Sequence, residues 1–164
     1  MTAPIQTSIE IAKEYLHFGA AHFTIFSATE RENLHGHNFY VTATMDCAIG
    51  DDGLAFDYNL VKRELKKLCD ALDEKMLLPD RSPHLTLLHE DGYVIARFNG
   101  ERIPFLPRDV LIMPLRNITV EELAGHFLAT LLATPTIAAL PLAGMEIKVS
   151  SGPGQWAGAR WRSA

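Results

Sequence analysis

Residues 34–41 read Leu34-His35-Gly36-His37-Asn38-Phe39-Tyr40-Val41, and the rest of the chain can be organised around this stretch. Side chains of a β-strand alternate between its two faces, so a strand here projects His35 and His37 on the same side. His22 ends an upstream apolar segment, residues 18–22, which also has the composition of a strand. If the two strands pair, three imidazoles converge, as in a catalytic zinc site with one open position. The alternative is one core histidine bonded to backbone and two surface histidines.

Composition limits the class of protein. The chain has 164 residues, of which 48% are hydrophobic and 21% charged, which predicts one compact domain over residues 1–164. A formal net charge of -5 argues against general attraction to nucleic acid. Residues 1–7 lack the pattern of a signal peptide, and no apolar run is long enough to span a membrane, so we expect a soluble cytoplasmic protein. Cys47 and Cys69 are too few for a disulfide framework and are expected to be buried as small hydrophobes.

Hydrophobic periodicity predicts strands and two amphipathic helices. One helix follows Asp57 and extends to Met76, and the second starts at Thr119 and ends near Leu132. The predicted strands cover residues 5–11 (continued by 13–18 towards 22), 18–22, 39–48, 83–88, 92–98, 101–105, 110–113, 144–150 and 155–162. This order predicts an α+β domain, with an antiparallel sheet, two helices on one face and a small β insert.

Several blocks, spread over most of the chain, resemble the 6-pyruvoyl-tetrahydropterin synthase family, which includes the 6-carboxy-tetrahydropterin synthases of queuosine biosynthesis. The matching blocks are Phe18-Gly19-Ala20-Ala21-His22, Leu34-His35-Gly36-His37-Asn38-Phe39, Asp57-Tyr58-Asn59-Leu60-Val61-Lys62, Leu72-Asp73 and Asn117-Ile118-Thr119-Val120-Glu121-Glu122-Leu123-Ala124. The blocks also keep the order of the family.

The resemblance implies a tunnelling fold (T-fold), with a four-stranded antiparallel sheet and two helices in each subunit. It implies a homo-oligomer, a trimeric barrel or a dimer of trimers, with active sites between subunits. His22, His35 and His37 would bind Zn(II). The substrate would be 7,8-dihydroneopterin triphosphate, whose side-chain oxygens zinc would polarise so that an acid/base group could move carbon-bound protons.

The first departure from the family concerns the catalytic base. The usual family has a cysteine in the loop before His-Gly-His, and residues 30–34 contain none. A branch of the family has glutamate in an Arg-Glu-x-Leu-His-Gly-His context, and Glu32 fits that branch. Its members resemble enzymes that cleave the dihydroneopterin triphosphate side chain to give 6-hydroxymethyl-dihydropterin. Glu32 is therefore the candidate base, and the alternative is a solvated loop carboxylate.

Two further departures concern proton transfer and pterin recognition. Asp73 is retained, but Glu74 stands where the family has histidine, so Glu74 is either a proton acceptor or an exposed glutamate at a helix end. The family also anchors the pterin guanidine edge with a glutamate in the first of the last two strands. Here Val149 or a neighbouring serine takes that position, and Glu146 could compensate only in a different register. Otherwise recognition rests on backbone groups with Thr119 and Glu121, or the ligand is not a standard pterin.

Three hypotheses follow from these observations. The first is a zinc-dependent pterin lyase or synthase that works without the usual cysteine. The second is a non-catalytic paralogue that binds zinc and a pterin or another heterocycle. The third is a structural oligomer with adventitious metal binding.

Overall fold

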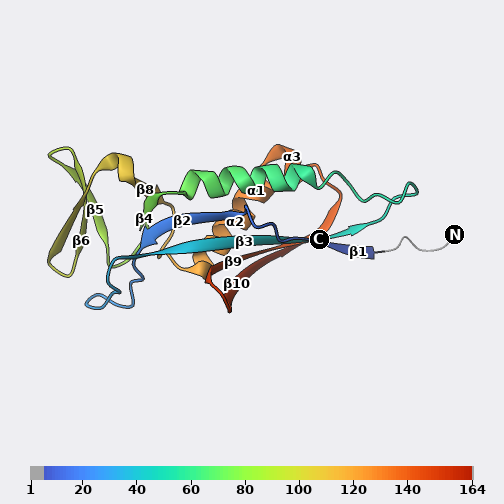
Figure 1. The fold of residues 1–164 in the computed structure, drawn as a ribbon. Coiled ribbons are helices and arrows are strands. Elements are labelled where there is room, and N and C mark those ends of the chain that lie inside the picture. The colour runs from blue at the N-terminus through green and yellow to red at the C-terminus, as the bar shows by residue number, and fades with distance from the viewer. Residues whose placement is uncertain (1–5, 164) are drawn as a thin grey trace.

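The computed structural model describes residues 6–163, which form an α+β fold (Figure 1). The strands and helices, in chain order, are β1 (Gln6–Ile11), β2 (His17–His22), β3 (His35–Ala48), α1 (Asn59–Leu72), β4 (Lys75–Pro79), β5 (Thr86–Glu90), β6 (Tyr93–Phe98), β7 (Glu101–Phe105), the 3-10 helix η1 (Pro107–Asp109), β8 (Val110–Met113), α2 (Val120–Ala133), α3 (Pro135–Ala138), β9 (Leu142–Gly152) and β10 (Gln155–Arg162). Among these residues, no helix is both long and apolar enough to cross a membrane.

The main sheet has the order β10-β9-β3-β2-β4-β8, and β1 pairs with β3 as a seventh strand. Antiparallel pairing joins β10, β9, β3 and β2, which are the four strands that the resemblance implies. The prediction of a purely antiparallel, four-stranded sheet is wrong in its strand count. Strand β4 pairs in parallel with both β2 and β8, because the chain crosses over through α1 and through the β insert before it returns to the sheet.

Strand β3 is the long central element of the sheet. It begins at His35, four residues before the predicted strand, so the two histidines of residues 34–41 do lie on a strand. Residues 6–11 pair with its far half and residues 17–22 with its near half. The predicted continuous strand through residues 13–18 is interrupted, because residues 13–16 form a turn in which Leu16 N–H donates to the Lys13 carbonyl at 3.0 Å.

One face of this sheet is buried under α1 and α2. Residues paired directly across β2 and β3 share a face, and Phe18 stacks on Phe39 with ring centroids 5.0 Å apart. Phe127 of α2 stacks on Phe18 at 5.9 Å, and all three rings are fully buried. Burial of each such side chain contributes about 1.5–3 kcal/mol, which fixes the helices on this face. Two helices on one face of the sheet were predicted.

Helix α1 is shorter than predicted. It ends at Leu72, and Met76 lies in β4 rather than on the helix. The sequence favours Asp57 as the N-cap, and this prediction is wrong by one residue: the N-cap is Tyr58, and the Asp57 carboxylate accepts the N–H of the first helical residue, Asn59, at 3.0 Å. Glu74 has a φ of 58°, and this left-handed residue turns the chain from the helix into β4.

The predicted β insert is present as a separate three-stranded antiparallel sheet, β5-β6-β7. Its two hairpin turns are formed by the Asp91-Gly92 and Asn99-Gly100 pairs, all with positive φ, as two-residue turns require. The buried side chains of the insert pack against Phe23 and Ile25, which follow β2, and against β4. Figure 1 shows the insert at the end of the molecule beside the loop that joins β2 to β3.

Candidate metal centre

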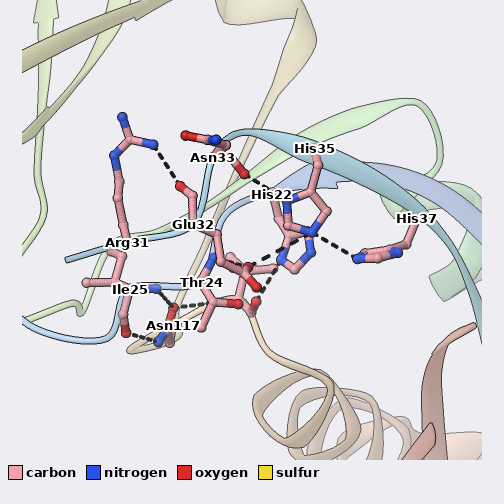
Figure 2. A network of polar contacts seen from close by, with 10 residues as sticks. His22, Thr24, Ile25, Arg31, Glu32, Asn33, His35, His37 and Asn117 are labelled. Atoms are coloured by element: carbon pink, nitrogen blue, oxygen red, sulfur yellow. Dashed lines mark hydrogen bonds and ion pairs between the residues drawn. The ribbon is translucent and has the colours of Figure 1, made fainter.

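Three histidines converge where β2 ends and β3 begins, as the sequence predicts. His22 lies directly opposite His35 in the strand register, and His37 lies two residues further along the same face. One nitrogen from each ring lies within 4.8 Å of the others. Figure 2 shows the three rings pointing towards one another. The group can therefore hold a metal ion.

Backbone carbonyls orient two of the rings. The Ile118 carbonyl, just before α2, lies 2.9 Å from His22 Nδ1, and the Asn33 carbonyl lies 2.8 Å from His35 Nδ1. Because a carbonyl only accepts hydrogen bonds, each Nδ1 carries the proton and each Nε2 keeps its lone pair. Metal-binding histidines are held in this way by a partner on the second ring nitrogen.

The surroundings of the three Nε2 atoms are consistent with a shared metal ion. His22 Nε2 is buried and has no hydrogen-bond partner within residues 6–163. Nε2 of His35 lies 2.9 Å from Nε2 of His37. A bound cation would take up the lone pair of His22 Nε2 and would replace the contact between the other two Nε2 atoms, and three imidazole nitrogens suit zinc, copper, iron or nickel.

The electrostatics of the site favour neutral imidazole ligands. Burial lowers the pKa of His22, and the nearby His35 and His37 lower it further against the raising effect of the Ile118 carbonyl. Burial also lowers the pKa of His37, with His35 acting in the same direction. Neutral rings are the forms that bind metal, so at neutral pH protons compete weakly for these two nitrogens.

Glu32 lies beside the three histidines. Its Oε2 atom accepts the Thr24 N–H at 2.9 Å and lies 3.9 Å from His35 Nε2. Burial acts to raise the pKa of Glu32, but the hydrogen bonds from Thr24 and the imidazoles of His35 and His22 outweigh it, so the pKa is lowered. The carboxylate is therefore ionised at neutral pH, which is the form a proton acceptor needs, and the lowered pKa also reduces its strength as a base.

The histidines and Glu32 open into one cavity of about 380 Å³. The lining residues come from β2, β3, the loop between them, the start of α2 and the adjoining ends of β9 and β10: His22, Thr24, Glu32, His35, His37, Phe39, Thr119, Val120, Glu121, Ser151 and Gln155. Thr119 and Glu121, the predicted pterin-binding residues, thus share the cavity with the histidines. Thr24 and Gln155 were not predicted, because neither carries a motif and only the fold brings them here.

The start of α2 places two of these residues. Thr119 is the N-cap, and its hydroxyl accepts the Glu122 N–H at 3.3 Å, which is one half of the capping box that a threonine and a glutamate three residues later can form. The Glu122 carboxylate does not complete that box; it accepts from the Arg116 N–H at 3.2 Å and pairs with the Arg116 guanidinium. Thr119 and Glu121 therefore face the cavity from a well-fixed helix end.

Asp73 and Glu74 lie elsewhere in the chain. The Asp73 carboxylate accepts the Gly19 N–H at 2.7 Å, and the Glu74 N–H donates to the Gly19 carbonyl at 2.7 Å. Glu74 lines a second depression, together with His37, Asn38 and Lys75. Neither carboxylate lines the cavity of the three histidines in the described chain, so their catalytic role stays a prediction.

Glu146 does not replace the missing pterin-anchoring carboxylate within the described chain. It is paired with Thr44 in the sheet, its Oε1 accepts from Arg160 Nε at 2.7 Å, and its Oε2 lies 3.9 Å from Lys148. These groups line a different hollow on the sheet. At the predicted position, Val149 is buried in the core and Ser151 lines the cavity of the three histidines.

The fold and the site define a class of protein: an α+β protein whose three-histidine group, able to hold a metal, shares a cavity with an ionised carboxylate. Residues 10–160 match the family model described as 6-pyruvoyl tetrahydropterin synthase. The chain belongs to this family.

Named relatives agree with this assignment. A protein of Methanocaldococcus jannaschii, named putative 6-carboxy-5,6,7,8-tetrahydropterin synthase, is 28% identical over 68% of this chain and 69% of its own length. The structure of Plasmodium falciparum 6-pyruvoyl tetrahydropterin synthase is 25% identical, with a TM-score of 0.89 over 96% of this chain and 99% of that one. A Plasmodium vivax 6-pyruvoyltetrahydropterin synthase, solved with a catalytic glutamate replaced by alanine, is 25% identical and has a TM-score of 0.90 over 97% and 99%.

Proposed function

We propose that the chain is a zinc-dependent lyase that acts on 7,8-dihydroneopterin triphosphate, by cleavage of the side chain or by elimination of triphosphate. The observation that carries this proposal is the Glu32 carboxylate, held beside the three histidines in the same cavity. A base next to a Lewis-acid site is what abstraction of a carbon-bound proton needs.

Each group of the cavity has a role in this proposal. His22, His35 and His37 would hold the zinc ion, which would supply Lewis-acid polarisation of a substrate oxygen. Glu32 accepts a proton from a carbon of the substrate side chain and returns it later. Thr119 and Glu121 offer a hydroxyl and a carboxylate for the donors of a pterin ring.

The named relatives support this assignment of function. The M. jannaschii relative is named a putative 6-carboxytetrahydropterin synthase, and the two Plasmodium structures are of 6-pyruvoyltetrahydropterin synthases. In the P. vivax enzyme a glutamate is described as a catalytic residue. A carboxylate base is therefore consistent with this fold, and we assign that role to Glu32 here.

The remaining parts of the proposal concern assembly and location. We propose a homo-oligomer, a trimer or a dimer of trimers, in which residues 1–164 are one domain, in the cytoplasm. Within residues 6–163, Asp73 and Glu74 do not line the three-histidine cavity of their own chain. In such an assembly they could instead line the three-histidine cavity of a neighbouring subunit. The product and its pathway, folate or queuosine, follow from which side-chain bond is broken.

Turnover of 7,8-dihydroneopterin triphosphate by purified protein, with analysis of released triphosphate and of the pterin products, tests this function. Glu32→Gln is the decisive variant, because its amide oxygen can still accept the Thr24 N–H while its basicity is lost. We expect the loss of one acid/base group to lower kcat about 100- to 10,000-fold. Glu30→Ala, which removes an exposed carboxyl group from the same loop, is the matched control. Full activity of Glu32→Gln would remove Glu32 from the mechanism.

A second candidate is a non-catalytic zinc- and pterin-binding paralogue. The observation that favours it is that Val149, one candidate for the position of the family's pterin-anchoring glutamate, is buried in the core, and that Ser151, another candidate, presents a serine to the cavity instead of a carboxylate. Calorimetric titration with a panel of pterins distinguishes the two functions. Tight binding without turnover would establish the paralogue, and robust turnover of any member of the panel would dismiss it.

A further inference from the structure

Main-chain hydrogen bonds fix the residue proposed as the base. The Glu32 N–H donates to the Thr24 carbonyl at 2.9 Å, while the Glu32 carboxylate accepts the Thr24 N–H at 2.9 Å. The Glu32 carbonyl accepts from Nη1 of Arg31 at 2.8 Å. The position of the carboxylate thus depends on the neighbouring Arg31 side chain as well as on Thr24 (Figure 2).

The Arg31 guanidinium is itself held by the β insert. Its Nε and Nη2 atoms donate to Glu101 Oε2 at 3.1 and 2.6 Å, and Glu101 is the first residue of β7. The guanidinium carbon lies 5.0 Å from the ring centre of Phe23 and 5.7 Å from that of Phe98. The Arg31 side chain is only 17% exposed, whereas that of Glu101 is 55% exposed.

These contacts use the whole guanidinium group. Its planar fork donates to a carboxylate and to a main-chain carbonyl while its faces lie against aromatic rings. A lysine ammonium at the same place can keep one charge contact but cannot make this combination. An exposed ion pair is worth little in stability, so the value of the arrangement lies in its geometry.

We propose that Arg31 is a positioning residue that fixes Glu32 beside the three histidines, and that the β insert acts on the cavity through Arg31. Arg31 is not among the residues that line the cavity, so it acts through Glu32 rather than on the substrate. This role rests on the proposed function of Glu32, and it means that the β insert helps to fix the position of the Glu32 carboxylate. A misplacement of about 1 Å in a catalytic group can lower a rate about 100-fold.

Three variants in the full-length protein test this role. Arg31→Lys keeps the charge and removes the fork, and Glu101→Gln keeps an acceptor but removes the charge that holds the guanidinium. Arg102→Gln is the matched control, because Arg102 follows Glu101 in β7 and pairs instead with Glu90 on the surface of the insert. Each protein is assayed for kcat, KM, zinc content and Tm, and for hydrogen exchange of the Thr24 and Glu32 amides.

A positioning role changes these quantities selectively. We expect Arg31→Lys to lower kcat on the order of 100-fold and to leave KM within about threefold, with zinc content unchanged. Exchange at the Thr24 and Glu32 amides should accelerate about tenfold or more, because both hydrogen bonds depend on the held loop. In both kcat and amide exchange, Glu101→Gln should be intermediate between Arg31→Lys and Arg102→Gln, and Arg102→Gln should match wild type.

The exchange measurement separates this inference from the proposed function. If the wild-type protein turns over no pterin, the proposed function fails, and faster exchange in Arg31→Lys alone still supports the positioning of Glu32. Wild-type exchange at both amides in Arg31→Lys would overturn the inference, whatever the activity. An unchanged kcat in Arg31→Lys, with an active wild-type protein, would also overturn it.

Discussion

Replacement of Asn117 by alanine should destabilise the protein by about 2–4 kcal/mol. Its side-chain amide accepts the Ile25 N–H at 3.1 Å and the Ile118 N–H at 3.1 Å, and it donates to the Ile25 carbonyl at 2.8 Å. Three hydrogen bonds at a net 0.5–1.5 kcal/mol each sum to about 1.5–4.5 kcal/mol, and the expected loss is the middle of this range. The variant also releases the loop that carries Glu32 from the start of α2, and Ile118 is the residue whose carbonyl orients His22.

Asn117→Asp provides a second comparison. The carboxylate keeps an acceptor for the Ile25 and Ile118 N–H groups, but it loses the donor to the Ile25 carbonyl and sets an anionic oxygen against that carbonyl. We therefore expect a loss of at least about 0.5–1.5 kcal/mol, the net value of one hydrogen bond. Urea unfolding followed by tryptophan fluorescence, at one fixed protein concentration because assembly affects apparent stability, measures both values. An alanine variant within about 0.5 kcal/mol of wild type, which is the usual range for neutral surface changes, would refute this reasoning. An aspartate variant as stable as wild type would also contradict it.

Three further predictions concern stability and reactivity. Burial raises the pKa of Cys69 to about 12 and also raises that of Cys47, so neither thiol should react with a disulfide reagent at pH 8 until denaturant is added; reaction of the native protein would contradict this. Burial lowers the pKa of His126 below its usual 6.5, so the unfolded state binds the proton first as the pH falls and stability is lost below about pH 6.5. Between pH 7.5 and 5, the Tm of His126→Gln should therefore fall less than the Tm of wild type. An equal fall in both proteins would contradict the role of His126. Thr119→Ala should lower stability by about 1 kcal/mol in urea unfolding through loss of the cap to Glu122, whereas Thr119→Ser should match wild type.

Local sequence patterns predicted most of the elements that carry the three histidines. Alternation of side chains on a strand placed His35 and His37 on one face, and that rule holds wherever the strand pairs. The N-cap chemistry at Thr119 and the turn dipeptides of the insert are likewise local, so their structures were predictable. The α+β class follows from the order of these elements.

The features that escaped prediction depend on pairing between distant segments. Met76 continues the helical spacing of α1, but it pairs with Val110 in the parallel part of the sheet. No local pattern shows that the chain will leave the helix at Glu74 and return to the sheet. The strand count was wrong for this reason.

Contacts around the cavity between residues far apart in the sequence could not be predicted either. Arg31 and Glu101 are 70 residues apart, and their ion pair exists only because the insert folds against the residues after β2. Asp73 and Glu74 stand in the sequence where the family order predicts an acid/base pair. In the fold, however, Asp73 accepts a hydrogen bond from Gly19, and Glu74 lines a separate depression. Sequence order alone does not reveal which cavity a side chain lines.

Metal content is the measurement that tests the central claim most directly. The claim is that His22, His35 and His37 form one zinc site in each chain. His35 is the best residue to replace, because its side chain is 35% exposed, whereas His22 is buried in the fold. Elemental analysis of protein purified without an affinity tag should give one zinc per chain, and His35→Ala should lose most of it while remaining folded. Substoichiometric zinc that His35→Ala leaves unchanged would contradict the claim.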